Sequence, residues 1–273
     1  GRGRRLQAPP VKQAAQRLGI GTILQPESVR EPDFARAVRD LEADLIVVVA
    51  FRILPPDVFT AARLGSFNLH GSLLPRYRGA APIHRAVMAG DSETGVTTFF
   101  LKEKVDTGDM ILQRSMSIGP DETTGDVHDR MMRIGAEAVL DTVRMIDDGS
   151  VTEVPQDDRL ATPAPKVFRE EGEVDWSGPA ATLHNLIRGL SPVPGAWTTW
   201  REGTLKLYRS RLADGAGRPG TVLEAGPRLI VACGEGAVEI SELQAEGRRT
   251  MSASDFLNGV DLVPGEPLGP IER

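Results

Sequence analysis

Residues 44–50 read Asp-Leu-Ile-Val-Val-Val-Ala, an almost unbroken run of apolar, mostly β-branched side chains. Such a run is typical of a parallel strand that is buried on both faces. Around it, helical patterns alternate with short apolar segments typical of strands. We expect helices over 11–18, 33–41, 56–62, 82–89 and 124–148, and strands over 20–24, 67–70, 96–101 and 109–114. This alternation predicts an α/β fold with an open parallel sheet.

The second half of the chain has a different texture. Residues 151–170 contain three prolines among many polar residues, which indicates an extended linker. After a helix expected over 179–188, short apolar strands recur between glycine-rich turns at 197–200, 205–209, 221–223, 229–232 and 238–243. Five short strands at this spacing predict a small barrel. We therefore divide the chain into a first domain over 1–150, a linker over 151–176 and a second domain over 177–273.

Charge is unevenly distributed in a chain whose net charge is −6. Residues 1–26 and 58–90 contain several arginines and no acidic residue. Local basic surface on an acidic protein favours one specific anionic substrate over general affinity for nucleic acid. For either segment taken alone, ordinary solvated arginines are the better interpretation. A single cysteine excludes a disulfide framework within the chain and fits a reducing cytoplasm. The longest apolar run is too short to span a membrane, and no signal peptide is visible.

Three polar side chains follow predicted strands. Asn68 and His70 end the strand 67–70 and, two residues apart, lie on one face of it. Asp106 follows the strand 96–101. Side chains at the carboxyl ends of strands are where an α/β fold builds a small-molecule site. From the residues alone, a functional site and an ordinary turn contact are about equally good interpretations.

The chemistry open to this trio is limited. No serine or cysteine is placed to act as a nucleophile beside His70, and neither paired carboxylates at glycosidase spacing nor a metal-ligand cluster is visible. What remains is attack by a substrate amine on an activated carbonyl, without a metal. Asn68 and His70 can donate hydrogens to the developing oxyanion, and Asp106 can orient the imidazole and accept the proton that the amine loses.

Longer motifs surround these residues. The stretch 70–83 reads His-Gly-Ser-Leu-Leu-Pro-Arg-Tyr-Arg-Gly-Ala-Ala-Pro-Ile, and 105–110 reads Val-Asp-Thr-Gly-Asp-Met. Further on, 164–166 reads Ala-Pro-Lys, and 187–197 contains Ile-Arg-Gly-Leu followed by Pro-Gly-Ala-Trp. Together these motifs resemble the methionyl-tRNA formyltransferases over nearly the whole chain. The resemblance implies a Rossmann-like formyltransferase domain followed by an OB-like β-barrel domain that binds tRNA.

The resemblance also implies roles for individual residues. Asn68, His70 and Asp106 would be catalytic, the formyl donor would be 10-formyltetrahydrofolate, and the acceptor would be initiator methionyl-tRNA. The folate contacts would be Phe51, Arg52, Ile53, Leu54, Ser72, Leu73, Leu74 and Pro75. The tRNA contacts would be Arg2, Arg4, Arg5, Arg76, Arg78 and Lys166, with the first three in a basic loop at the acceptor end. Arg76 and Arg78 could instead hold the loop that carries them. We expect a cytoplasmic monomer.

The chain departs from the family at its start. It begins at Gly1 inside a basic segment, without the family's first strand, helix and second strand. We therefore expect a fragment that, alone, folds poorly or binds folate weakly. Two alternative functions stay open: a sibling formyltransferase that acts on a nucleotide or sugar amine, and a tRNA-binding fragment without activity.

Overall fold

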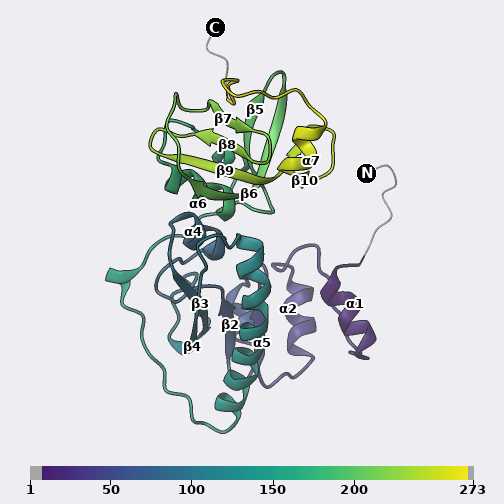
Figure 1. Ribbon diagram of the computed structural model, residues 1–273. Helices are drawn as coiled ribbons and strands as arrows, with labels where there is room; N and C mark the ends of the chain where they lie inside the picture. The colour runs from purple at the N-terminus through teal and green to yellow at the C-terminus, as the bar shows by residue number, and fades with distance from the viewer. Residues whose placement is uncertain (1–7, 270–273) are drawn as a thin grey trace.

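The computed structural model describes residues 8–269 (Figure 1). Arg2, Arg4 and Arg5, the predicted basic loop, lie outside the described residues. The first lobe is built on a sheet whose strand order is β1-β2-β3-β4. Its strands are β1 (Ile46–Val49), β2 (Ser66–His70), β3 (Glu93–Phe100) and β4 (Met110–Ser117). The parallel pairing is between β1 and β2, whereas β2, β3 and β4 pair antiparallel, so this Rossmann-like sheet is mixed.

The helices of the first lobe begin at local sequence signals. Those before β4 are α1 (Pro10–Arg17), α2 (Pro32–Arg39), α3 (Pro56–Phe59) and α4 (Pro82–Met88), each with a proline in its first turn, where no N–H partner is needed. The long helix α5 (Thr124–Asp147) begins at a capping box between Thr123 and Asp126. It packs on one face of the sheet, where the buried Thr98 and Thr142 hydroxyls lie 2.8 Å apart. The opposite face is left for other segments.

Two details of the predicted sheet are wrong. Residues 20–24 form no strand, and Ile20 and Leu24 are exposed, because no strand of the described part of the chain lies beside them. The run around β1 is not buried on both faces either. Burial alternates along β1, with Val47 40% and Val49 51% exposed, because α5 packs mainly on β3 and β4 and leaves its face of the edge strand β1 open.

An extended segment joins the two lobes. Val154 pairs with Met110 at the start of β4 through two backbone hydrogen bonds of 2.8 and 2.9 Å. Further along, Pro163 bridges to Arg78. We call residues 154–164 the crossing segment. It contains one short turn of 3₁₀ helix (Asp158–Leu160), and a second such turn (Arg169–Gly172) follows it.

The second lobe is an antiparallel sheet of order β5-β6-β9-β8-β7 with β10 added to β9. Its elements are α6 (Ala180–Gly189), β5 (Ala196–Trp200), β6 (Gly203–Ala213), β7 (Val222–Ala225), β8 (Leu229–Ala232), β9 (Ala237–Ala245), β10 (Met251–Ser252) and α7 (Ala253–Asn258). The five predicted strands are confirmed. The sheet encloses one core that also takes in Trp176, Leu183, Ile187 and Phe256, which gives the lobe the expected barrel-like form (Figure 1).

The lobes meet where α4 packs against α6 (Figure 1), and polar contacts join them at the start of α5. The Arg209 guanidinium on β6 makes hydrogen bonds of 2.8 and 2.9 Å to both carboxylate oxygens of Asp126 at the start of α5. The Thr124 hydroxyl donates to the Gly189 carbonyl, and the Arg188 guanidinium donates to the Glu122 carbonyl. The two lobes are therefore held in a defined orientation. No helix within residues 8–269 is long and apolar enough to cross a bilayer.

Candidate active site

The face of the first sheet that α5 does not cover carries the candidate site. Asn68 pairs in register with Phe99, and His70 with Thr97. Directly paired residues of neighbouring strands share a face, so these four side chains lie together. His70 is buried and Asn68 is half-buried. The prediction that Asn68 and His70 lie on one face is thus consistent with the register.

Asp106 reaches His70 by a route that the sequence pattern did not predict. Because β2 and β3 are antiparallel, their carboxyl ends lie at opposite edges of the sheet. The loop 101–109 instead folds back along β3, where the Phe100 amide donates to the Asp109 carbonyl. Gly108 makes this close approach possible, since a Cβ there would come within 1.5 Å of the Phe100 carbonyl oxygen. The loop leaves Asp106 Oδ2 3.8 Å from His70 Nδ1, with both side chains buried.

The His70 ring is held by its backbone surroundings. Its Nε2 lies 2.8 Å from the Tyr77 carbonyl oxygen, which only accepts hydrogen bonds, so we assign the hydrogen to Nε2. The other nitrogen faces Asp106 across a gap too long for a direct hydrogen bond. Phe99 packs edge-on against the ring. This arrangement fixes the imidazole between a carbonyl and a carboxylate.

Asp106 is held equally firmly. Its Oδ2 accepts a hydrogen bond of 2.9 Å from the Gly79 amide. Its backbone is left-handed, with φ of 56°, a conformation that Asp tolerates better than most residues. Tyr77 is left-handed as well, with φ of 61°, and its hydroxyl donates to Asp91. Strained backbone of this kind clusters at functional sites.

The loop 71–79 that carries the sequence motif is attached to the sheet through Thr97. The Thr97 hydroxyl donates to the Ser72 carbonyl and accepts from the Leu74 amide, and the Gln113 side chain donates to the Leu74 carbonyl. Ser72 and Leu74 are fully or almost fully buried, and the Ser72 hydroxyl donates to the Arg76 carbonyl. Ser72 and Leu74, two of the predicted folate contacts, therefore stabilise the loop from its buried side. The other two predicted contacts in this loop, Leu73 and Pro75, are half-buried.

The other predicted folate contacts follow β1. Phe51 is 57% and Ile53 65% exposed, and Leu54 is half-buried. The Arg52 guanidinium donates to the Glu27 carbonyl, which ties this segment to the 25–31 region. Both exposed apolar side chains follow the carboxyl end of β1, where the resemblance predicts folate contacts.

The predicted tRNA contacts are placed differently from one another. Arg76 is half-exposed and pairs with Asp91 at 2.9 Å. Lys166 is exposed, with its ammonium 5.6 Å from the centroid of the Phe168 ring. Arg78, by contrast, is only 13% exposed and is engaged by Gln156 and Asp158 of the crossing segment. Of its two roles considered above, holding the loop is the one that these contacts support.

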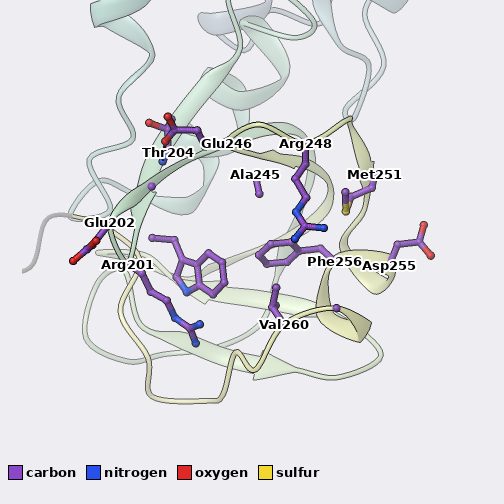
Figure 2. Close-up of a pocket in the computed structure, with 13 residues that line it drawn as sticks. Arg201, Glu202, Thr204, Ala245, Glu246, Arg248, Met251, Asp255, Phe256 and Val260 are labelled. Carbon is purple, nitrogen blue, oxygen red and sulfur yellow. Dashed lines mark hydrogen bonds between the residues drawn. The ribbon is translucent and has the colours of Figure 1, made fainter.

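A cavity of about 320 Å³ lies elsewhere, in the second lobe. Figure 2 shows Arg201 and Arg248 among its lining residues, together with the apolar side chains of Phe256 and Val260. It is lined by residues between 200 and 260, without Asn68, His70 or Asp106. The candidate site is therefore the sheet of the first lobe, where groups able to polarise a carbonyl lie on one face. The described residues hold no cluster of side chains suited to a metal ion.

Comparison with known proteins bears on this geometry. The formyl transferase family model matches residues 1–143, and that of the formyl transferase C-terminal domain matches 166–261. A methionyl-tRNA formyltransferase from Geobacter metallireducens is 47% identical over 98% of this chain and 87% of that protein. One from Chlorobium luteolum is 50% identical over 92% of this chain and 81% of that protein. The chain belongs to the methionyl-tRNA formyltransferase family.

Solved structures show the same fold. HypX from Aquifex aeolicus, in complex with tetrahydrofolic acid, superposes with a TM-score of 0.66 at 21% identity, over 83% of this chain and 41% of that one. A methionyl-tRNA formyltransferase from Clostridium thermocellum superposes with a TM-score of 0.56 at 17% identity, over 74% of this chain and 88% of that one. The Rossmann-like lobe followed by the antiparallel lobe is thus the family's architecture.

Proposed function

We propose that this protein transfers the formyl group of 10-formyltetrahydrofolate to the amino group of initiator methionyl-tRNA, with Asn68, His70 and Asp106 at the reacting centre. The convergence of these three side chains on one face of the sheet, in a chain 47% identical to a methionyl-tRNA formyltransferase, carries the proposal. The exposed apolar pair Phe51 and Ile53 would receive the folate ring. Arg76 and Lys166 would meet tRNA phosphates.

In this proposal the residues stabilise one developing charge and accept one proton. Asn68 donates its amide N–H to the formyl oxygen as the methionyl nitrogen attacks the formyl carbon. His70 donates a second N–H to the same oxygen, in competition with the Tyr77 carbonyl that takes it in this structure. As the new C–N bond forms, Asp106 accepts the proton lost by the amine. The bond between the formyl carbon and the folate nitrogen then breaks, and a proton returns to that nitrogen.

The test replaces each polar group singly and measures formyl transfer to methionyl-tRNA. Asn68→Ala and Asp106→Asn should each lower kcat by about 10²- to 10³-fold, as expected for loss of one group acting on the transition state. The affinity for methionyl-tRNA should stay within about threefold. Asn258→Ala, at an exposed amide in the second lobe, is the matched control and should leave kcat unchanged.

Other outcomes would separate the alternatives. Unchanged turnover in either site variant would overturn the proposed centre. If the protein with its site intact transferred formyl groups to a nucleotide sugar amine but not to methionyl-tRNA, the acceptor would be wrong and the chemistry right. Binding of methionyl-tRNA without any transfer would leave a tRNA-binding protein.

A further inference from the structure

The crossing segment places one amide side chain against the loop that carries Asp106. The Gln156 Nε2 group donates to two backbone carbonyls, that of Asp106 at 3.0 Å and that of Gly108 at 2.8 Å. Its Oε1 accepts two hydrogen bonds from the Arg78 guanidinium, at 2.9 and 2.7 Å. Both hydrogens and both lone pairs of the amide are therefore in use. The opposite orientation of the amide would turn its N–H groups toward the cationic guanidinium, so the contacts fix it.

Arg78 is in turn fixed on all sides. Its Nη1 lies 2.7 Å from the Asp158 carboxylate, and the hydrogen bond from the Arg78 guanidinium lowers the pKa of Asp158. Its backbone N–H donates to the Thr162 carbonyl, and its carbonyl accepts from the Ala164 amide. Arg78 therefore belongs to the crossing segment's hydrogen-bond network as much as to its own loop.

These contacts meet at Asp106 from two directions. Gly79, the residue after Arg78, donates its amide to the Asp106 carboxylate, while Gln156 holds the Asp106 carbonyl. Asp106, which these two contacts hold, has a left-handed backbone. The directions of its carboxylate and its carbonyl therefore depend on a backbone conformation that neighbouring residues must stabilise. With the anchors in place, Oδ2 lies 3.8 Å from His70.

We infer that Gln156 is a positioning residue for Asp106: it holds the 101–109 loop so that the carboxylate faces His70, and it does so without touching substrate. This inference rests on the proposed function. Displacement of a reacting group by about 1 Å can lower turnover by about 10²-fold. A residue that acts only through the position of Asp106 should therefore affect kcat and leave substrate binding alone.

Gln156→Glu is the sharpest variant because it preserves size. The carboxylate can still accept from Arg78, but it cannot donate to the Asp106 and Gly108 carbonyls and is repelled by them. We expect kcat for formyl transfer to fall by about 10- to 100-fold. The KM values for 10-formyltetrahydrofolate and methionyl-tRNA should stay within about threefold. Gln244→Glu is the matched control, since Gln244 also accepts from a side chain and donates to a carbonyl, but in the second lobe.

A double-mutant cycle separates positioning from a general structural effect. If Gln156 acts through the Asp106 carboxylate, the variant carrying both Gln156→Glu and Asp106→Asn should turn over within about threefold of Asp106→Asn alone. Losses that multiply would overturn the inference, as would wild-type kcat in Gln156→Glu. Wild-type kcat in Asp106→Asn would instead overturn the proposed centre. If Gln156→Glu does not fold, Gln156→Asn, which keeps a neutral amide but shortens its reach, enters the same cycle with the same criteria.

Discussion

At the scale of single residues, the site depends on backbone positions that few side chains can occupy. Gly79 is the clearest case, because its amide anchors Asp106 and its φ is 129°. A Cβ at this position would lie 2.6 Å from the Ala164 carbonyl oxygen. The crossing segment thus passes directly over the glycine that holds the carboxylate.

Gly79→Ala should therefore lower the free energy of unfolding by about 2–4 kcal/mol, through backbone strain and the clash with Ala164. Gly149→Ala is the matched control, since φ there is 72° and a Cβ would meet nothing within 4 Å. Strain alone should cost about 1–2 kcal/mol at that position. Urea unfolding of both variants measures the difference, and equal losses would contradict the predicted contact.

At the scale of elements, the start of α5 combines a helix cap with a contact between lobes. The Asp126 carboxylate accepts hydrogen bonds from the Thr123 backbone and hydroxyl, and also from Arg209. Burial raises the pKa of Asp126, but the hydrogen bonds from Arg209 and Thr123 outweigh it and hold the pKa at about 2.

A carboxyl group whose pKa is lowered on folding stabilises the folded state above its unfolded pKa, and this stabilisation is lost as the pH falls through the folded value. For Asp126 the contribution is complete above about pH 4 and disappears toward about pH 2. We expect about 1–2 kcal/mol, because solvent screens a pair that is one-third to one-half exposed.

Two variants divide this contribution. Arg209→Gln should remove the contact between lobes and keep the cap, whereas Asp126→Asn should remove the charge from both. Thermal unfolding at pH 7 should therefore rank wild type above Arg209→Gln, and Arg209→Gln above Asp126→Asn. Equal midpoints for the two variants would show that the cap contributes nothing measurable.

The elements also show what the sequence could predict. Periodicity located helices α1–α6 and strands β1–β9, because burial against a partner leaves a pattern in the chain. It missed the short elements β10 and α7, and the strand predicted over residues 20–24 does not form. It could not reveal the direction of pairing. Asp106 was expected near His70 because strand ends were expected to gather at one edge, yet it arrives by a loop that doubles back along an antiparallel strand. Gln156 left no signal, since a single polar residue in a proline-rich linker gives no indication of a contact made 50 residues away.

At the scale of the whole molecule, His184 lies buried where the lobes meet. Its Nε2 donates to the Pro120 carbonyl of the first lobe, and its Nδ1 accepts from the Ser210 hydroxyl of the second. Burial lowers the pKa of His184, with the nearby Arg188 acting in the same direction and the Pro120 carbonyl and Asp121 opposing it. The neutral ring thus joins the two lobes.

A histidine whose pKa is lowered on folding binds its proton more readily in the unfolded chain. The free energy of unfolding should therefore fall as the pH drops below about 6.5, by at most about 1.4 kcal/mol per pH unit from this residue. His184→Gln should flatten the pH dependence between about pH 6.5 and pH 5. His128→Gln, at an exposed ring, is the matched control for the substitution. An unaltered slope in His184→Gln would contradict the assignment.

The crossing segment has a consequence for how the chain can vary in length. Its ends are fixed by two bridges, Val154 to Met110 and Pro163 to Arg78, and Gln156 makes its contacts between them. One inserted or deleted residue shifts an extended chain by about 3.4 Å, more than the length of a hydrogen bond. Connecting segments usually tolerate insertions well. Here the crossing segment, which has almost no regular secondary structure, should tolerate inserted or deleted residues least. The turn at Gly149, where a Cβ would meet nothing within 4 Å, should accept them readily.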